Sequence, residues 1–307
     1  MKKIALVTCV LSENPIPDFH LYFQRIAKEK HQVQVDIYKN GELCYVVGNE
    51  EKILYRGVEI GDYDLIFNRF AIRSIHSADY YVLRAFENRN IPVINPTYSI
   101  IKAKDKLLTL QILMNHKLPI TPSLIVRNRQ QLADSIENIQ GPPYIIKNCF
   151  GSGGKNILLA YDKPQLFAMF DYTWVRDRNA ILLVQPFVRS IENHEDVRVI
   201  TLGHETHYAM IRTAAHGEYR TNIAVGGQVR ATVLSDEEKN MCATAAKAMN
   251  LSICGIDFMR TKEGPVILEV NSCPGLDGIS QAYDPEISIF EKIVDFVCTY
   301  KGASDEI

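Results

Sequence analysis

Three oxygen-bearing side chains with a short spacing stand near the end of the sequence. Asp257 belongs to the run CGIDFM, and Glu269 and Asn271 belong to the run PVILEVN. Both runs are short, apolar and rich in β-branched residues, so we expect two strands joined by the turn RTKEG. Side chains alternate across a strand, so Glu269 and Asn271 should share one face, with the valine and leucine side chains of their run on the other.

Two carboxylates and an amide oxygen on paired strands would form a site for a hard cation. Magnesium prefers oxygen ligands and takes few of them from protein, with phosphate oxygens completing its shell. The alternative is that Asp257 and Glu269 are surface charges on an exposed hairpin and that Asn271 is a turn residue. The adjacent run CPGLDG favours the metal site, because its proline and glycines should hold an ordered turn beside the carboxylates.

A glycine-rich loop lies between the expected strands YIIK and ILLA. It is not a Walker A motif, because the required first glycine and the Ser/Thr after the lysine are missing and a strand follows. Glycines let backbone N–H groups approach phosphate oxygens and let a loop swing, so a mobile flap over a nucleotide is expected. The alternative is a flexible hairpin tip. The expected flap residues are Gly151, Ser152, Gly153 and Gly154.

Two lysines are candidates for phosphate contacts. Lys147 ends the apolar strand YIIK, where a partly buried ammonium group without an anion would be costly. A phosphate would supply that anion, whereas the alternative is a lysine that reaches solvent at a strand edge. Lys106 could add a second contact, although it lies in a lysine-rich helix whose charged side chains could simply face solvent.

The run VQPFV continues an apolar strand and indicates a place for a flat base. A carbonyl there can accept from an amino group, and the next free N–H can donate to a ring nitrogen. Pro186 has no N–H, so Phe187 is the expected donor, next to Gln185. The alternative is a strand end broken by proline. Asp196, at the start of the next strand, could bond ribose hydroxyls.

Three arginines are candidates for contact with phosphates. Arg198 could be a structural or a phosphate-facing cation, and Arg220 belongs to the polar cluster YRTN just before a glycine pair. Arg212 lies in the run HYAMIR. An arginine beside a polyanion neutralises developing charge with a fixed fork of donors. Each arginine taken alone could instead be a surface salt-bridge partner.

The first third of the chain must supply a scaffold for these groups. It alternates as strand, helix, strand, strand, helix and strand through about residue 96, which predicts an open, mostly parallel sheet with helices on its faces. Ligands gather at the carboxyl ends of strands in such sheets. Asn68 and Arg69 follow the strand DLIF, so they are candidate substrate contacts.

The remaining elements are expected to alternate between strands and helices. One helix is expected over 99–116, and a hairpin pair, VRVITLG and HYAMIR, follows later. A helix over 235–250 should begin with a capping box of Ser235 and Glu238. A final helix is expected near 286–300.

The composition is that of an ordinary globular protein. The chain has 307 residues, 47% hydrophobic and 23% charged, which suggests about two domains. A net charge of −2 indicates no nucleic-acid partner. No run approaches the ~20 apolar residues of a membrane span, and the start lacks a signal-peptide cleavage pattern. Seven cysteines without a Cys-x-x-Cys pair predict reduced thiols in a cytoplasmic protein.

Taken in order, these pieces resemble the ATP-grasp superfamily. Within it the chain is most similar to the RimK-like amino-acid ligases, which include ribosomal-protein glutamate ligases and lysine-biosynthesis ligases that act on a carrier protein. The likeness covers roughly residues 1–300, and EVNSCPGLDGI is specific whereas the glycine flap alone is not. The stretches that carry it are KAKDKLLTLQIL, YIIKNCFGSGGKNI, LLVQPFV, DVRVITLG, EYRTNIAVGG and CGIDFMR with PVILEVNSCPGLDGI.

The resemblance implies an α/β protein with an ATP-grasp fold and an N-terminal domain built on an open parallel sheet. It divides the chain into three expected parts. These are an N-terminal substrate domain over 1–97, a central subdomain with the glycine flap over 98–184, and a C-terminal subdomain with the metal site over 185–307.

The resemblance also implies how the nucleotide is held. Lys106, Lys147 and the flap would contact phosphates. Gln185 to Phe187 would hold adenine, and Asp196 would hold the ribose. The family usually has glutamate where this chain has Pro186, but that position acts mainly through its carbonyl, so adenine binding should survive.

The reacting groups follow from the same resemblance. Arg220, Thr221 and Asn222 would face the ATP phosphates and the reacting carboxylate, with Arg212 near the acyl phosphate. The oxygen triplet would hold two Mg²⁺ ions, bridged by Glu269, for which Mn²⁺ could substitute. Ribosomal-protein ligases carry a basic residue just before the glycine pair, where this chain has valine, so the acceptor is left open.

The implied activity is an ATP- and Mg²⁺-dependent carboxylate–amine ligase that acts through an acyl phosphate. It would add glutamate or a similar amino acid to a peptide, a protein or a small acceptor, and the family suggests a homo-oligomer, either a dimer or a tetramer. One alternative is a small dipeptide ligase of the D-alanine–D-alanine or glutathione synthetase type. Another is a non-catalytic ATP-binding regulatory module, which the complete metal triplet and Lys147 disfavour.

Overall fold

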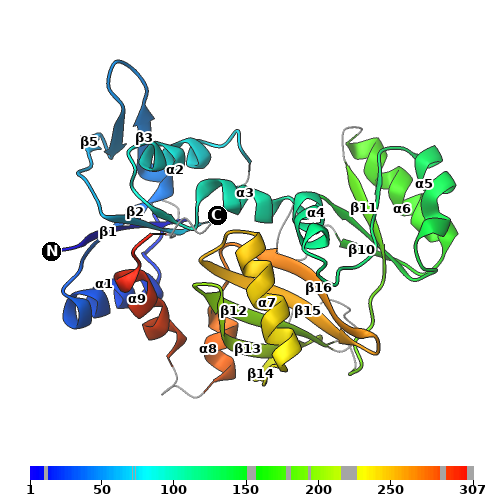
Figure 1. Ribbon diagram of the computed structural model, residues 1–307. Coiled ribbons are helices and arrows are strands. Elements are labelled where there is room, and N and C mark those ends of the chain that lie inside the picture. Colours follow the sequence, from blue (N-terminus) through cyan, green and yellow to red (C-terminus); the bar gives the residue numbers. More distant parts are fainter. Residues whose placement is uncertain are drawn as a thin grey trace.

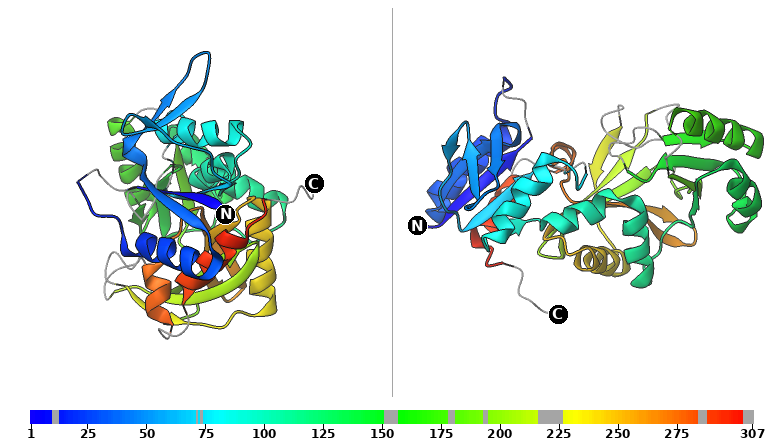
Figure 2. Two further views of the ribbon diagram at one scale, coloured as in Figure 1. Left: turned by 90° about the vertical axis from the view of Figure 1, so that its left-hand side faces the viewer. Right: turned by 90° about the horizontal axis from the view of Figure 1, so that it is seen from above.

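Three lobes follow one another along the chain, and a computed structural model shows their arrangement (Figures 1 and 2). Seen from above, the lobes form an elongated molecule with the N-terminal lobe at one end (Figure 2). The structure describes residues 1–9, 13–70, 72, 74–150, 157–177, 181–192, 195–215, 227–283 and 288–302.

The N-terminal lobe is built on a four-stranded parallel sheet, as the sequence predicts. The strand order is β2-β1-β6-β7, and all three pairings are parallel. The inner strand β1 is buried from its second residue onward, as expected of a parallel strand with helices on both faces of its sheet. The elements are β1 (Lys3–Thr8), α1 (Asp18–His31), β2 (Gln34–Lys39), β6 (Leu65–Arg69), α2 (Ala78–Asn88) and β7 (Val93–Ile94).

A small antiparallel sheet projects from this lobe, at the upper left of Figure 1. Sequence reasoning did not anticipate it, because its strands are only two to four residues long, too short for a clear alternating pattern. Ile53 is its anchor, since this side chain is fully buried in the core beneath. The elements are η1 (Asn40–Glu42), β3 (Leu43–Val46), β4 (Lys52–Tyr55) and β5 (Val58–Glu59).

The helix expected over 99–116 is in fact two helices, so that prediction is wrong at its centre. α3 (Thr97–Lys104) and α4 (Lys106–Asn115) meet at Asp105. The Asp105 carboxylate caps α4 by accepting from the amides of residues 107 and 108 at 2.9 and 3.1 Å. The Lys106 amide donates to the Cys149 carbonyl at 3.0 Å, which fixes the break against the central lobe.

The central lobe is an antiparallel sheet of order β10-β9-β11-β8 with two α-helices beside it. Because β11 bonds to a neighbour on each side, the boundary expected between 184 and 185 falls inside a strand. We propose to place that boundary after Pro186. The elements are β8 (Leu124–Val126), α5 (Arg129–Ser135), η2 (Ile136–Asn138), β9 (Tyr144–Asn148), β10 (Ile157–Ala160), α6 (Lys163–Arg176) and β11 (Leu182–Pro186).

The C-terminal lobe is a five-stranded antiparallel sheet of order β14-β13-β12-β15-β16. α7 lies across one face, and it begins with the predicted capping box of Ser235 and Glu238. The hairpins predicted around residues 203 and 262 are both confirmed. The elements are β12 (Glu195–Leu202), β13 (Glu205–Thr213), β14 (Gln228–Ala231), α7 (Asp236–Ala248), β15 (Ile253–Thr261), β16 (Gly264–Asn271) and α8 (Asp277–Ala282).

A β-bulge interrupts the expected alternation in β16. Asp257 pairs with Glu269, but the next residue of β15 pairs with Ile267, so Leu268 has no partner on β15. Ile267 and Val270 are therefore the buried residues, and Val266 and Leu268 are only half-buried. The predicted apolar face of alternate valines and leucines is wrong for this reason.

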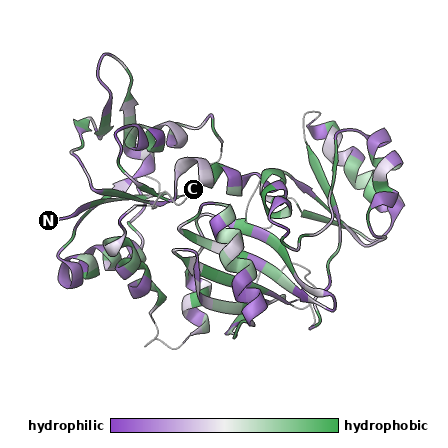
Figure 3. Cartoon of the chain, in the orientation of Figure 1, coloured by the Kyte–Doolittle hydropathy of each residue, from purple (hydrophilic) through white to green (hydrophobic). Residues whose placement is uncertain are grey.

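The last helix returns to the N-terminal lobe. α9 (Ile289–Thr299) packs against α1, and one apolar core joins both helices to the parallel sheet and to strands of the C-terminal lobe. Figure 3 shows apolar residues along the strands and hydrophilic ones on the outer helices. Within the described part of the chain, no helix is both long and apolar enough to cross a membrane.

Candidate active site

The structure brings the three oxygen-bearing side chains together. Asp257 on β15 stands directly opposite Glu269 on β16, and Gly255 stands opposite Asn271. The Asn271 amide nitrogen lies 3.4 Å from Asp257 Oδ2. Asp257 is buried and the other two are half-buried, so the group is open on the Glu269 and Asn271 side.

Two arginines hold the Asp257 carboxylate. Arg198 Nε and Nη2 donate to its two oxygens at 2.7 Å each, and Arg212 Nη2 lies 3.0 Å from Oδ2. Burial by itself would raise the pKa of Asp257, but the two guanidinium groups outweigh it and keep the pKa below the usual range. Asp257 is therefore a carboxylate anion whose position is set before any ligand arrives.

Arg212 also holds Asp196. This contact bears on two predictions, that Asp196 binds the ribose and that Arg212 lies near the acyl phosphate. Its Nε and Nη2 donate to the two Asp196 oxygens at 2.7 and 2.6 Å, and both side chains are buried. Burial disfavours the charged guanidinium, but Asp257 and Asp196 raise the pKa of Arg212 above its ordinary value. A ribose would have to share Asp196 with this arginine, and the role of Arg212 near an acyl phosphate stays a prediction.

Two lysines stand beside Glu269. Lys106 Nζ lies 3.9 Å from Glu269 Oε1, and Lys106, Lys147 and Glu269 line one small pocket together with the bulged Leu268. Burial lowers the pKa of Lys147 to about 8, while Glu269 raises it and Lys106 lowers it. Two ammonium groups thus stand on the open side of the three oxygen-bearing residues. A polyanion bound there would find both cations within reach.

The expected base-binding run is ordered but differs from the prediction in one respect. Gln185 is buried and its side chain donates to Ser123 Oγ at 2.6 Å. Pro186 ends β11. The Phe187 amide donates to the Pro143 carbonyl at 2.8 Å, so the prediction that Phe187 is the free donor is wrong.

The two candidate substrate contacts of the N-terminal sheet have different surroundings. Asn68 is buried and bonds through both side-chain atoms to the backbone of Phe70, at 2.9 and 3.2 Å, so it shapes the turn after β6. Arg69 reaches out of the sheet and donates to the Pro274 carbonyl at 3.1 Å. Pro274 follows the β15–β16 hairpin, so Arg69 alone of the pair connects to the rest of the candidate site.

The remaining predicted contacts lie outside the described residues. The flap residues and the polar cluster both fall in this category, so their roles rest on the sequence. They are Gly151, Ser152, Gly153, Gly154, Arg220, Thr221 and Asn222.

Sequence reasoning did not predict the contacts that Arg198 and Asp105 make. It gave Arg198 two options, and the structure shows it clamping Asp257. The signal was present, because Asp196 and Arg198 are two apart and so share a face with their strand neighbours. Asp105 was overlooked inside a lysine-rich helix, although aspartate is a common N-cap and here it sets where Lys106 begins α4.

The donor set fits a divalent cation with oxygen ligands. Among the described residues no cluster of three or more His, Cys, Asp or Glu side chains is placed to bind a metal. The triplet here has two carboxylates and an amide oxygen, which suits Mg²⁺ when phosphate oxygens complete the shell. Asp257 Oδ2 already accepts from both Arg198 and Arg212, whereas Oδ1 accepts from Arg198 and keeps a second lone pair for a cation.

Comparisons with known proteins agree with this arrangement. The RimK-like ATP-grasp domain model matches residues 103–297. A probable alpha-L-glutamate ligase of Vibrio vulnificus is 33% identical over 250 residues, covering 80% of this chain and 81% of that protein. Another, from Saccharophagus degradans, is 31% identical and covers 94% of each chain.

Solved structures share the fold at lower identity. The ATP-grasp ligase PsnB in complex with its minimal precursor superimposes with a TM-score of 0.71 at 16% identity, covering 96% of this chain and 98% of that one. A D-alanine–D-alanine ligase from Bacillus anthracis gives 0.68 at 15% identity, covering 97% and 96%. The predicted ATP-grasp fold is confirmed.

Proposed function

Because this chain belongs to the RimK-like ATP-grasp ligase family, we propose that it joins glutamate or a similar amino acid to a peptide, protein or small acceptor. ATP would be the energy source, and ADP and phosphate would be released. The relatives named probable alpha-L-glutamate ligase support glutamate as the first amino acid to test.

One observation carries the proposal. Asp257, Glu269 and Asn271 converge on one face, and Lys106 and Lys147 stand beside the same Glu269. Oxygen ligands next to two ammonium groups suit a metal-bound polyphosphate better than any neutral ligand. PsnB was solved with Mg and ADP, which supports the same ligands for this fold.

The reaction we propose has two steps. A substrate carboxylate oxygen attacks the γ-phosphorus of ATP, and ADP leaves, which produces an acyl phosphate. The amine of the second substrate then attacks the acyl carbon, and phosphate leaves with its bonding electron pair. The amine loses its proton and an amide bond remains.

The protein contributes mainly through charge and position. Lys106 and Lys147 would offset charge on the transferring phosphoryl group, and Arg198 with Arg212 would keep Asp257 ionised and oriented. Asp257, Glu269 and Asn271 would hold Mg²⁺, two ions by the family resemblance, whose charge would offset that of the phosphates. The Gln185 and Pro186 carbonyls would face the adenine amino group.

The test is a phosphate-release screen of amino acids against acceptors, with mass spectrometry of the products. Addition of amino-acid masses to a peptide or protein supports the proposal, and a product of two small amino acids indicates a dipeptide ligase. Glu269→Ala is the inactive reference, in which turnover should be lost. Its side chain is only half-buried, so its removal should leave the fold intact. Mg-ATP binding without ADP formation in any pair of substrates would refute the proposal. Sedimentation would test the expected dimer or tetramer.

A further inference from the structure

Arg69 is a half-buried cation that lacks an anionic partner in the described part of the chain. Its guanidinium lies over the rings of Phe19 and Phe67, at 5.6 and 5.9 Å from their centroids. One nitrogen donates to the Pro274 carbonyl, while Nε is buried and has no hydrogen-bond partner among the described residues. Burying a guanidinium without an anion is costly, so an anion that accepted from this fork would stabilise the buried charge.

His20 is a second buried polar group at the same place. His20 is only 7% exposed, and within the described part of the chain the Pro17 carbonyl is the polar group that acts on its ring, although neither ring nitrogen reaches hydrogen-bond geometry. Burial and the nearby positive charge of Arg69 lower the pKa of His20 to about 4, although the Pro17 carbonyl opposes this shift. At neutral pH His20 is therefore an uncharged ring with one N–H to donate, and Arg69 supplies the charge.

The surroundings of this pair also favour an anion. His20 lies in the first turn of α1, a helix of 14 residues whose N-cap is Pro17, which has no side-chain cap hydrogen bond. The amino end of a helix carries partial positive charge. Arg69 is the last residue of β6 and so lies at the carboxyl end of the parallel sheet, where ligands bind in such folds.

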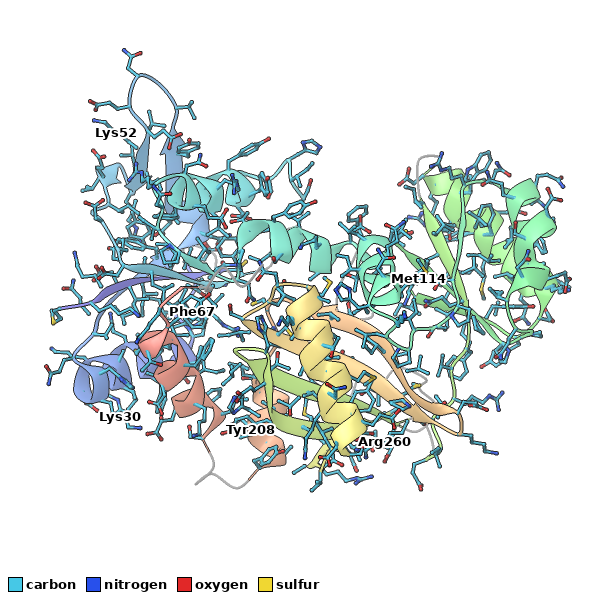
Figure 4. All side chains as sticks on the ribbon, in the orientation of Figure 1. Lys30, Lys52, Phe67, Met114, Tyr208 and Arg260 are labelled. Carbon is cyan, nitrogen blue, oxygen red and sulfur yellow. The ribbon has the colours of Figure 1, made fainter. Side chains whose placement is uncertain are left out.

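Arg69 connects this pair to the segment that follows the β15–β16 hairpin. Pro274, which Arg69 contacts, is three residues beyond Asn271. Three residues of chain span at most about 11 Å, so the Arg69 guanidinium lies within roughly 15 Å of the Asn271 backbone. Phe67, labelled in Figure 4, has its ring under Arg69. It belongs to the apolar core that the N-terminal sheet shares with Leu202 and Ile253 of the C-terminal lobe.

We propose that Arg69 and His20 bind a carboxylate of the amino-acid substrate, one that is not activated in the reaction. This inference rests on the proposed ligase function and names the part of the site that recognises the amino acid. A planar guanidinium fork matches a carboxylate in a bidentate way. The nucleotide phosphates would have their own cations in Lys106 of α4 and Lys147 of β9, outside the N-terminal sheet.

The test measures equilibrium binding of L-glutamate to the full chain loaded with magnesium and a non-hydrolysable ATP analogue. Arg69→Gln should weaken L-glutamate binding tenfold or more and leave the affinity for the analogue unchanged. Arg69→Lys, which keeps the charge but loses the fork, should fall between. Arg84→Gln is the matched control, because Arg84 is an exposed arginine of α2 paired with Glu87. L-Glutamine and isoglutamine, each lacking one carboxylate, would show which carboxylate is held.

Several results would overturn the inference. These are wild-type affinity for L-glutamate in Arg69→Gln, no binding of L-glutamate or L-aspartate to the wild type, or Arg69-dependent binding of inorganic phosphate instead. Unchanged binding of the analogue shows that a variant is folded. Because turnover is not needed, Arg69-dependent binding without ADP formation would refute only the proposed function. If Arg69→Gln turned over substrate at the wild-type rate and with the wild-type KM for the amino acid, only the inference would be refuted.

Discussion

Arg212 and Arg230 lie on neighbouring strands, and each pairs with a carboxylate at the start of β12. Arg212 Nη2 lies 2.6 Å from Asp196 Oδ2, and Arg230 Nη2 lies 3.0 Å from Glu195 Oε2. The Arg212 side chain is 3% exposed and the Arg230 side chain is 58% exposed. The two ion pairs differ in burial and in that Arg212 also contacts Asp257, and both differences predict a larger loss at Arg212.

Replacing Arg212 by methionine should destabilise the protein strongly. The substitution leaves Asp196 buried without its cation and removes one of the two arginines that hold Asp257. Breaking a buried pair in this way costs about 3–5 kcal/mol, because the remaining charge is not compensated. Arg230→Met should cost about 1 kcal/mol or less, because water and salt already screen an exposed pair.

Urea unfolding followed by far-UV circular dichroism measures both free energies. Because the chain has three lobes and can unfold in stages, hydrogen exchange of the β12 amides should localise the loss. Adding Asp196→Leu to Arg212→Met should restore part of the stability, since it removes the uncompensated carboxylate. Equal losses for Arg212→Met and Arg230→Met, or no recovery in the double variant, would refute the argument from burial.

Two further predictions follow from the same region. Burial lowers the pKa of Lys147 to about 8, so the protonated form that would bind phosphates is lost as pH rises through that value. The dissociation constant for ATP should rise by up to about tenfold per pH unit above 8 and stay flat in Lys147→Arg, and a flat wild-type profile would contradict this. In Gly255→Ala the new methyl would meet Pro274 Cβ at 2.9 Å, so stability should fall by about 1–3 kcal/mol and magnesium affinity should weaken. Gly41→Ala, which meets nothing within 4 Å, is the control for melting temperature and magnesium titration.

The face of the oxygen triplet could be predicted from the sequence. Glu269 and Asn271 are two residues apart on one strand, and a short turn brings Asp257 alongside. The exact register could not be predicted, because the bulge at Leu268 depends on how Ile267 and Val270 fill the core beneath α7. A one-residue change in register moves every following side chain to the other face.

The position of Lys106 shows the limit of helical periodicity. Residues 99–116 contain no proline or glycine and carry apolar residues at helical spacing, so the pattern predicts one helix. The chain breaks at Asp105 because its carboxylate caps the second helix and because residue 106 bonds to the loop after β9. That second contact joins residues 43 positions apart, and no local pattern reports it.

The sequence by itself determined the two hairpins, the capping box and the shared face of Glu269 and Asn271, because each depends on residues that are close along the chain. It indicated the parallel sheet only through the order of strands and helices. Tertiary structure alone decided that Arg212 clamps two aspartates, that the Phe187 amide is already used, and that Arg69 reaches Pro274. These contacts join strands from different lobes or distant parts of the chain. Which strands become neighbours is set by burial of the shared core, and a residue's type does not specify its partner across that core.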